Sequence, residues 1–341
     1  MAVISGLGIY LPQRFHTAAH IAAASGMPEA VVRDKLGLTR KTVPGPDDHT
    51  NAMGVHAARD ALADAGITAD QLDVVISITE EHKEYPVWTA GIKTAHDLGA
   101  TRAYAFDLGQ KCGSGVLALR LAADMIRANG TDTILVAGGY RNGDLVSYAD
   151  PNVRFLFNLA AGGGAAVVRR DGPGFEILGF ASRTDGSFSE DVIVPVGGTR
   201  APINGHNGAE FRLQVTNPVG LKDRLEKKSL DNFVAVVEEA CAHSGIAPRD
   251  VAYAAVLHMK RSAHEHVLGR LGIPLERSIY LQNYGHIGQV DPLLSLKLAR
   301  DQGRFKDGDV VVMMVAGIGY VWNAMCLRYR APAVRAAGVP T

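Results

Sequence analysis

The sequence predicts an α/β fold made of two similar halves. Three observations support this class: short apolar runs alternate with helical patterns, the apolar runs have no polar face, and the second half repeats the order of the first. Strands that are apolar on both faces are typical of a sheet covered by helices on both sides.

The first half contains three predicted strands and one predicted helix. Residues 73–79 (Asp-Val-Val-Ile-Ser-Ile-Thr) and 103–108 are buried-strand runs, and residues 133–137 (Thr-Ile-Leu-Val-Ala) form a third strand. Residues 112–128 have apolar side chains at helical spacing on most sides, which predicts a helix with little exposed surface. This alternation is typical of parallel strands joined by helices.

The second half has the same rhythm. A long helical stretch covers 218–244 and leads into a strand at 252–258, which ends in a histidine. Helices at 264–271 and 292–301 follow, and a strand at 309–316 ends in glycines. Strands and helices therefore alternate in both halves of the chain.

Two pairs of strands resemble one another. The strand at 73–79 is similar to the strand at 252–258, and residues 133–139 are similar to residues 309–317. Because both pairs occur in the same order, we interpret the chain as a duplicated α/β unit.

The break between the two units falls near residues 170–175, where Arg-Asp-Gly-Pro-Gly interrupts the apolar pattern. We therefore divide the chain into an N-terminal half, residues 1–172, which carries the candidate cysteine, and a C-terminal half, residues 173–341, which carries the candidate histidines. The last residues, 331–341, are expected to fray.

Composition and charge exclude several functions. The 341 residues include 35 Lys plus Arg and 35 Asp plus Glu, so the net charge is zero and nucleic-acid binding is not predicted. No run reaches the roughly 18 apolar residues of a membrane helix, and the N-terminus does not resemble a signal peptide. The three cysteines form no C-x-x-C pair. We expect a cytoplasmic protein that binds neither membranes nor nucleic acid.

Cys112 is the first candidate catalytic residue. It lies in Gln-Lys-Cys-Gly-Ser-Gly, between a predicted strand and the helix that follows. A thiol at a helix N-terminus feels the positive end of the dipole, and Lys111 adds charge, so we expect the thiolate to be favoured. A buried structural cysteine is the alternative, and Cys241 and Cys326, inside a predicted helix and strand, fit that role.

Two histidines are the next candidates. His258 ends a predicted strand, and His286 lies in Tyr-Gly-His-Ile-Gly, a glycine-flanked turn that leads into a helix. In open α/β sheets, ligands bind at the carboxyl ends of the strands. Each histidine alone is more often a satisfied polar residue, but together with Cys112 they form a plausible nucleophile and imidazole set.

A family resemblance covers nearly the whole chain. The sequence resembles the condensing enzymes of the thiolase superfamily and is most similar in layout to β-ketoacyl-acyl carrier protein (ACP) synthase III. The motifs that carry it are 6–12 (Gly-Leu-Gly-Ile-Tyr-Leu-Pro), 35–40, the cysteine motif from Ala105 to Gly115, 195–200 (Pro-Val-Gly-Gly-Thr-Arg), and Tyr284-Gly-His followed by 308–322. The resemblance implies a thiolase-like five-layer αβαβα fold.

The resemblance also implies a mechanism. Cys112 would take an acyl group from acyl-CoA or acyl-ACP, and the backbone N–H groups of Cys112 and Ile318 would form the oxyanion hole. His258 and His286 would polarise the carbonyl of a malonyl-like thioester, whose decarboxylation and attack would produce a 3-oxoacyl product. No cofactor and no metal are implied.

The resemblance implies partners as well. It indicates a homodimer, with the Tyr85-Pro86 loop near the acyl tunnel of the partner. Lys35, Arg154 and Arg261 are the candidate contacts with CoA or ACP.

The chain departs from the family at three places. The asparagine of the family motif His-Gln-Ala-Asn is Arg261 here, and the asparagine of Tyr-Gly-Asn is His286. Glu80 begins a charged run where the family is mostly small or apolar. Its position before Cys112 resembles that of the general acid/base glutamate of HMG-CoA synthases, although a solvated charge run is the simpler interpretation.

Three alternatives therefore remain open. The acyl group on Cys112 could pass to a hydroxyl or amine acceptor in secondary metabolism. An aldol condensation like that of HMG-CoA synthase could use Glu80 as its base. A non-catalytic subunit is the third alternative, and the presence of Cys112, His258 and His286 argues against it.

Overall fold

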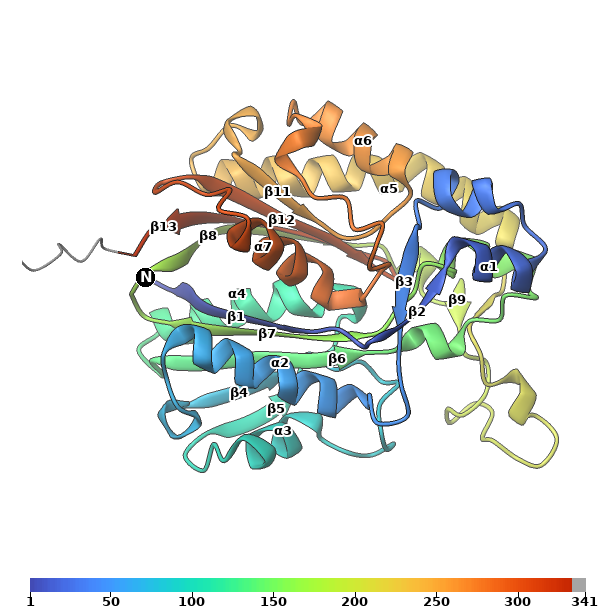
Figure 1. Ribbon diagram of the computed structural model, residues 1–341, viewed down its shortest axis with the longest axis horizontal. Helices are drawn as coiled ribbons and strands as arrows, with labels where there is room; N and C mark the ends of the chain where they lie inside the picture. The colour runs from blue at the N-terminus through green and yellow to red at the C-terminus, as the bar shows by residue number, and fades with distance from the viewer. Residues whose placement is uncertain (333–341) are drawn as a thin grey trace, which may run out of the picture.

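The computed structural model describes residues 1–332 and has five layers (Figure 1). Helices α2 and α3 cover one outer face, and α5 and α6 cover the other. Between them lie two parts of one nine-stranded sheet, with α4 and α7 enclosed between these parts. This arrangement confirms the predicted α/β fold and the five-layer architecture.

The N-terminal part of the sheet holds five strands. Their spatial order is β5 (Tyr104–Asp107), β4 (Val74–Ser77), β6 (Thr133–Tyr140), β7 (Gly162–Arg169) and β1 (Val3–Tyr10). β4 pairs in parallel with both β5 and β6, and β7 runs antiparallel to β6 and β1. The strands predicted at 73–79, 103–108 and 133–137 are therefore present, each within a few residues of its expected bounds.

The C-terminal part of the sheet repeats this pattern. Its order is β11 (Tyr253–Val256), β12 (Val310–Gly317), β13 (Val321–Arg330) and β8 (Gly174–Thr184). β11 is parallel to β12, and β13 is antiparallel to both β12 and β8. β4 and β6 thus correspond to β11 and β12, which confirms the predicted duplication.

The two parts of the sheet join at one end only. β1 and β8 pair through Val3 with Glu176 and Ile4 with Phe175. The turn from β7 to β8 covers residues 170–173, where the break was expected. The division into halves at residue 172 itself remains a prediction, and most of the expected frayed tail lies outside the described residues.

Six helices of the described residues form the helical layers, and the sequence pattern predicts α4, α5, α6 and α7 but not α2 and α3. The central ones are α4 (Ser114–Arg127) and α7 (Asp291–Asp301), and the outer ones are α2 (Thr50–Ala65), α3 (Ala90–Leu98), α5 (Pro218–His243) and α6 (Arg261–Arg270). α4 contacts strands of both parts of the sheet. Small buried residues such as Ala118, Ala122 and Ala123 let it fit there.

Two helix starts differ from expectation. The helix predicted from residue 112 begins with a 3-10 turn, Lys111–Gly113, which places Cys112 ahead of the α-helical ladder. α6 begins at Arg261, three residues before the expected His264, because polar residues hide the first turn of an outer helix from the apolar pattern. Within residues 1–332, no helix has the length and apolar content needed to span a membrane.

Shorter elements close one end of the molecule. They are β2 (Arg14–Thr17), α1 (Ala18–Ser25), a π-helical turn (Val31–Lys35), β3 (Arg40–Val43), β9 (Val192–Ile193) and β10 (Gln214–Val215). β2 pairs with β3, and β9 pairs with β10, outside the main sheet.

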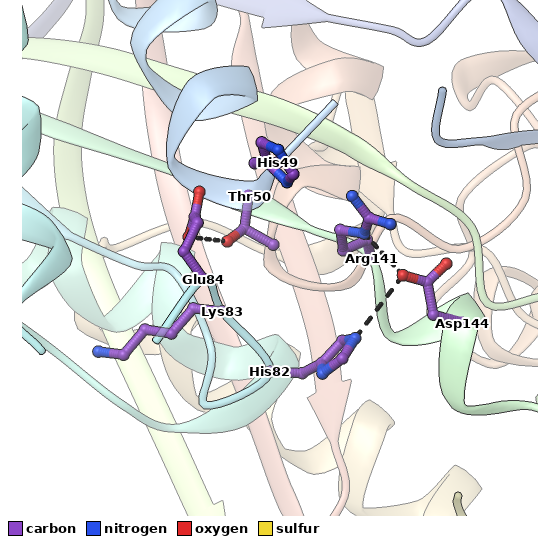
Figure 2. A pocket seen from close by; sticks show the side chains of 7 residues that line it. All are labelled: His49, Thr50, His82, Lys83, Glu84, Arg141 and Asp144. Carbon is purple, nitrogen blue, oxygen red and sulfur yellow. Dashed lines mark hydrogen bonds and ion pairs between the residues drawn. The ribbon is translucent and has the colours of Figure 1, made fainter. Parts of the chain in front are cut away.

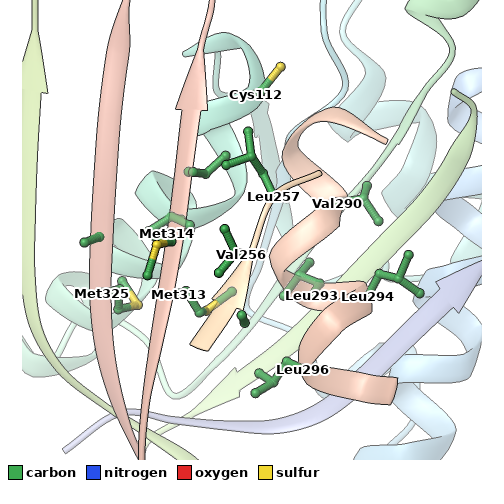
Figure 3. Packing of buried hydrophobic residues seen from close by; sticks show 14 of the residues in the cluster. Cys112, Val256, Leu257, Val290, Leu293, Leu294, Leu296, Met313, Met314 and Met325 are labelled. Carbon is green, nitrogen blue, oxygen red and sulfur yellow. The ribbon is translucent and has the colours of Figure 1, made fainter. Parts of the chain in front are cut away.

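The main hydrophobic core lies between the two parts of the sheet and ends at Cys112. Figure 3 shows Val256 of β11, Met313 and Met314 of β12 and leucines of α7 packed together. Cys112 lies at one end of this cluster and is 4% exposed. The core therefore holds the thiol rigidly and shields it from water.

Candidate active site

Three backbone segments converge on Cys112. The start of α4 packs against the 3-10 turn Gly288–Val290 so closely that a Cβ on Gly115 would lie 2.4 Å from the carbonyl oxygen of Gln289. The end of β12 approaches from the other side, because a Cβ on Gly317 would lie 3.1 Å from the backbone nitrogen of Cys112. Side chains larger than hydrogen at these positions would push the segments apart.

His286 is oriented by a buried carboxylate. Its Nδ1 lies 2.6 Å from Oδ2 of Asp291, a residue with no exposed surface. Asp291 also accepts hydrogen bonds from the backbone nitrogens of His258 and Ile287, each at 2.7 Å. Nδ1 of His286 therefore carries a proton and donates a hydrogen bond to Asp291, which leaves Nε2 for a substrate.

Glu80 is buried in the same volume. Its Oε2 accepts a hydrogen bond of 2.8 Å from Nδ2 of Asn142, and Oε1 has no partner among the described residues. Burial is the main cause that raises the pKa of Glu80, which favours its protonated form. The interpretation of Glu80 as part of a solvated charge run is wrong, because Glu80 is only 6% exposed.

The expected thiolate at Cys112 is also wrong for the resting site. Burial raises the pKa of the Cys112 thiol well above its ordinary value, and the charges of Glu80 and Asp291 raise it further. Lys111 acts in the opposite direction but forms an ion pair with Glu81. Burial and nearby negative charge thus outweigh the helix N-terminus.

Protein groups hold the ring of His258 at both nitrogens. Nε2 lies 3.1 Å from the carbonyl oxygen of Gly37, and Nδ1 lies 3.0 Å from Nδ2 of Asn158. Burial lowers the pKa of His258 to about 4. The structure thus brings the backbone of His258 to Asp291 but gives its ring other partners. Its catalytic role remains a prediction.

The remaining candidates lie around this centre. Ile318 is in the turn between β12 and β13, next to Gly317, which approaches the backbone of Cys112. Lys35 and Arg154 are exposed. Arg261 is half-buried, where it stacks on Tyr280 at 4.3 Å and donates to Gln282. The roles of these residues in the oxyanion hole and in CoA or ACP binding remain predictions.

A small polar pocket lies at the start of α2, and neither Glu80 nor Cys112 lines it. It has a volume of about 160 Å³ and is lined by His49, Thr50, His82, Lys83, Glu84, Arg141 and Asp144. Figure 2 shows Glu84 bonded to Thr50, and Asp144 between Arg141 and His82. Most of its charges are thus paired within the protein.

Sequence reasoning missed three polar residues of the site. Asp291 follows a valine and precedes a proline at a predicted helix start, so its position next to His286 could have been noticed. Asn142 and Asn158 lie in loops without a motif, and only the fold brings them to Glu80 and His258.

Comparisons with known proteins identify the family. A family profile described as 3-oxoacyl-(acyl-carrier-protein) synthase III matches residues 106–186, and its C-terminal counterpart matches residues 241–329. A β-ketoacyl-ACP synthase III of Symbiobacterium thermophilum is 29% identical, with 96% of this chain and 97% of that protein covered. The protein of the same name from Rhodobacter capsulatus is 27% identical, with 96% and 99% covered.

Solved structures extend the agreement to the fold. β-Ketoacyl-ACP synthase III of Thermus thermophilus has a TM-score of 0.83 at 25% identity, and the comparison covers 96% of this chain and 99% of that chain. The priming β-ketosynthase of the R1128 polyketide pathway has a TM-score of 0.87 at 23% identity, with 97% of each chain covered.

The family profiles, the relatives and the shared fold together identify a condensing enzyme of the thiolase superfamily. Within that superfamily, the chain belongs to the β-ketoacyl-ACP synthase III-like enzymes and is an acyltransferase.

The raised pKa of Cys112 predicts slow alkylation at neutral pH. Only the thiolate reacts, so the rate of iodoacetamide labelling should rise about tenfold per pH unit through neutral and mildly alkaline pH. Peptide mapping by mass spectrometry separates Cys112 from the two core cysteines, and Cys112→Ala provides the blank. If the labelling rate did not change with pH around and above neutral pH, the resting thiol would be ionised and the prediction would be wrong.

Proposed function

We propose that this enzyme joins an acyl group held on Cys112 to a malonyl-like thioester and so produces a 3-oxoacyl thioester. The observation that carries the proposal is the position of Cys112, which is buried at the start of α4 in a turn that contacts the Gly288–Val290 turn, next to the His286–Asp291 pair. Acyl-CoA or acyl-ACP would serve as the donor, as the names of the relatives suggest for ACP.

In the first half-reaction, the sulfur of Cys112 attacks the thioester carbonyl and the carrier thiol leaves. Because the pKa of Cys112 is raised, its proton must pass to a base as the bond forms. Glu80, in its ionised form, and His286 are the candidate bases in this volume. The backbone N–H groups of Cys112 and Ile318 would bind the tetrahedral oxyanion.

In the second half-reaction, the malonyl-like thioester loses carbon dioxide. The electron pair of the broken bond forms an enolate, which attacks the acyl carbonyl and releases Cys112 as a thiolate that regains a proton. Nε2 of His286 would have to carry a proton in this step and would donate it in a hydrogen bond to the thioester oxygen that becomes the enolate, while Asp291 holds the ring at Nδ1. Carbon dioxide is thus the expected co-product.

Acylation should occur on Cys112 alone. Intact-protein mass spectrometry with a panel of acyl thioesters measures the added mass, and peptide mapping locates it. We expect His286→Ala and Asp291→Asn to leave acylation nearly intact and to slow the second half-reaction by at least about 10²-fold. Acyl mass that persists in Cys112→Ala would refute the nucleophile, and loss of acylation in His286→Ala would instead make His286 the base for the thiol.

A second candidate function is favoured by the burial of Glu80. An aldol condensation must remove a proton from the acyl methyl group on Cys112, and this step requires a base. The charge of Glu80 acts on the Cys112 thiol and raises its pKa, so this carboxyl group lies close to the acylated sulfur. Decarboxylation needs no such base, because the loss of carbon dioxide generates the nucleophile.

The substitution Glu80→Gln separates these functions. Glutamine resembles a protonated glutamate and can still bond Asn142, so we expect at least about a tenth of wild-type turnover, with carbon dioxide released from a malonyl thioester. Glu81→Gln, at the exposed neighbour, is the matched control. A collapse of turnover limited to Glu80→Gln, without carbon dioxide from the wild type, would favour the aldol route. A product without a new carbon–carbon bond would indicate transfer to a hydroxyl or amine.

We also propose a homodimer that forms through β5. This strand is the edge of the sheet, where unpaired backbone groups can pair with a second copy. Apolar side chains around it are exposed: Tyr104 to 56%, Ile92 to 59% and Tyr85 to 64%. A second copy would cover this surface and bring the Tyr85-Pro86 loop towards its partner. The cytoplasmic location remains a prediction.

The substitution Tyr104→Glu should weaken the dimer. A charge on the edge strand disfavours pairing, so light scattering during size-exclusion chromatography should show the mass fall from twice the 36.2 kDa of one chain towards a single chain. Leu275→Glu changes an equally apolar side chain, 49% exposed and outside the proposed interface, and serves as the control. A wild-type protein with the mass of one chain, or a variant that stays dimeric, would contradict this interface.

A further inference from the structure

Asn158 connects the two histidines of the site. Its side-chain amide contacts Nδ1 of His258 at 3.0 Å. Its main-chain oxygen accepts a hydrogen bond of 2.8 Å from the backbone nitrogen of His286, and the nitrogen of Ala160 donates to the oxygen of His286 at 2.9 Å. One residue thus reaches the ring of one histidine and the backbone of the other.

The contacts of His258 determine where its ring carries the proton. The oxygen of Gly37 is a carbonyl and can only accept, so Nε2 of His258 must donate to it. Nδ1 of the neutral ring then accepts, and the group that faces it must be the amide nitrogen of Asn158. Neither nitrogen remains free for a substrate while these bonds persist.

The segment that carries Asn158 is anchored by a buried lysine. Lys41 is 1% exposed, and its Nζ donates to the carbonyl oxygen of Leu159 at 2.5 Å and lies 5.1 Å from the ring of Tyr148. The next residue, Thr42, donates its hydroxyl to the oxygen of Ala161 at 2.5 Å. Burial lowers the pKa of Lys41 to about 7, because desolvation of its ammonium group is costly, and the amine can donate this hydrogen bond in its charged and in its neutral form.

We propose that Asn158 is a positioning residue that keeps His258 in its neutral, Nε2-protonated form and sets the backbone of His286, with Lys41 as the anchor of its segment. His286 is then the one imidazole of the pair that meets the second substrate. This assignment rests on the proposed function, in which His286 acts in the second half-reaction.

The test is the substitution Asn158→Asp. A carboxylate at this position accepts a hydrogen bond from a protonated Nδ1, so His258 should become doubly protonated at neutral pH, which nitrogen–proton NMR of isotope-labelled histidine detects. His258→Gln identifies the signal. We expect the second half-reaction to slow by at least about tenfold, while acylation of Cys112 changes by less than about twofold. Lys41→Met should also slow the second half-reaction and leave the acylation of Cys112 nearly unchanged, without adding a charge beside His258.

Asn152→Asp is the matched control, because it adds the same charge to an exposed position of the same segment. A wild-type His258 that carries its proton on Nδ1 would overturn the proposal, and so would equal behaviour of the two aspartate variants. Failure of the wild type to become acylated on Cys112 would count against the proposed function alone, because the NMR measurement needs no substrate.

Discussion

The buried carboxylate of Asp291 is the constraint on which the site depends. It has no exposed surface and accepts hydrogen bonds from the ring of His286 and from the backbone nitrogens of His258 and Ile287. A buried charge is tolerated only when such donors surround it, and loss of one partner typically costs about 3–5 kcal/mol. Because Asp291 is the first residue of α7, the positive end of that helix also stabilises it. The strand end at His258, the turn at His286 and the helix are therefore held together by one group.

This charge has a consequence for the other acidic groups. Glu80 and Cys112 share the buried volume with Asp291, and a second negative charge there would lack comparable donors. Burial is the main cause that raises the pKa of both Glu80 and Cys112, and the charge of Asp291 adds to this effect at Cys112, so an ionised form of either group is disfavoured in the resting site. The chemistry then requires proton transfer at the moment of attack, rather than a thiolate stored in advance.

Much of the fold was predictable from the sequence because its signals are local. β4, β6, β11 and β12 are continuous apolar runs, and their repeated order indicated the duplication before any contact was known. Cys112 and His286 were predictable for a related reason, since residues at strand ends and helix starts of an open sheet gather at one edge.

The state of the thiol was not predictable, because it depends on burial and on Glu80, which looked like part of an exposed charged run. Asn158 was missed because its partners, His258 and the segment of Lys41, are about a hundred residues away in the chain. Local patterns contain no information on such contacts.

The duplication finally explains how two helix N-termini serve different purposes. α4 and α7 lie side by side between the parts of the sheet, and their starts meet where Gly115 touches Gln289. The start of α7 is neutralised by Asp291, whereas the start of α4 carries Cys112, whose thiol stays protonated at rest. The positive end of α4 is therefore not used to stabilise a resting thiolate. In the proposed mechanism, it would instead stabilise the oxyanion that forms when the thiol attacks, which is the stage at which preorganised donors lower a barrier.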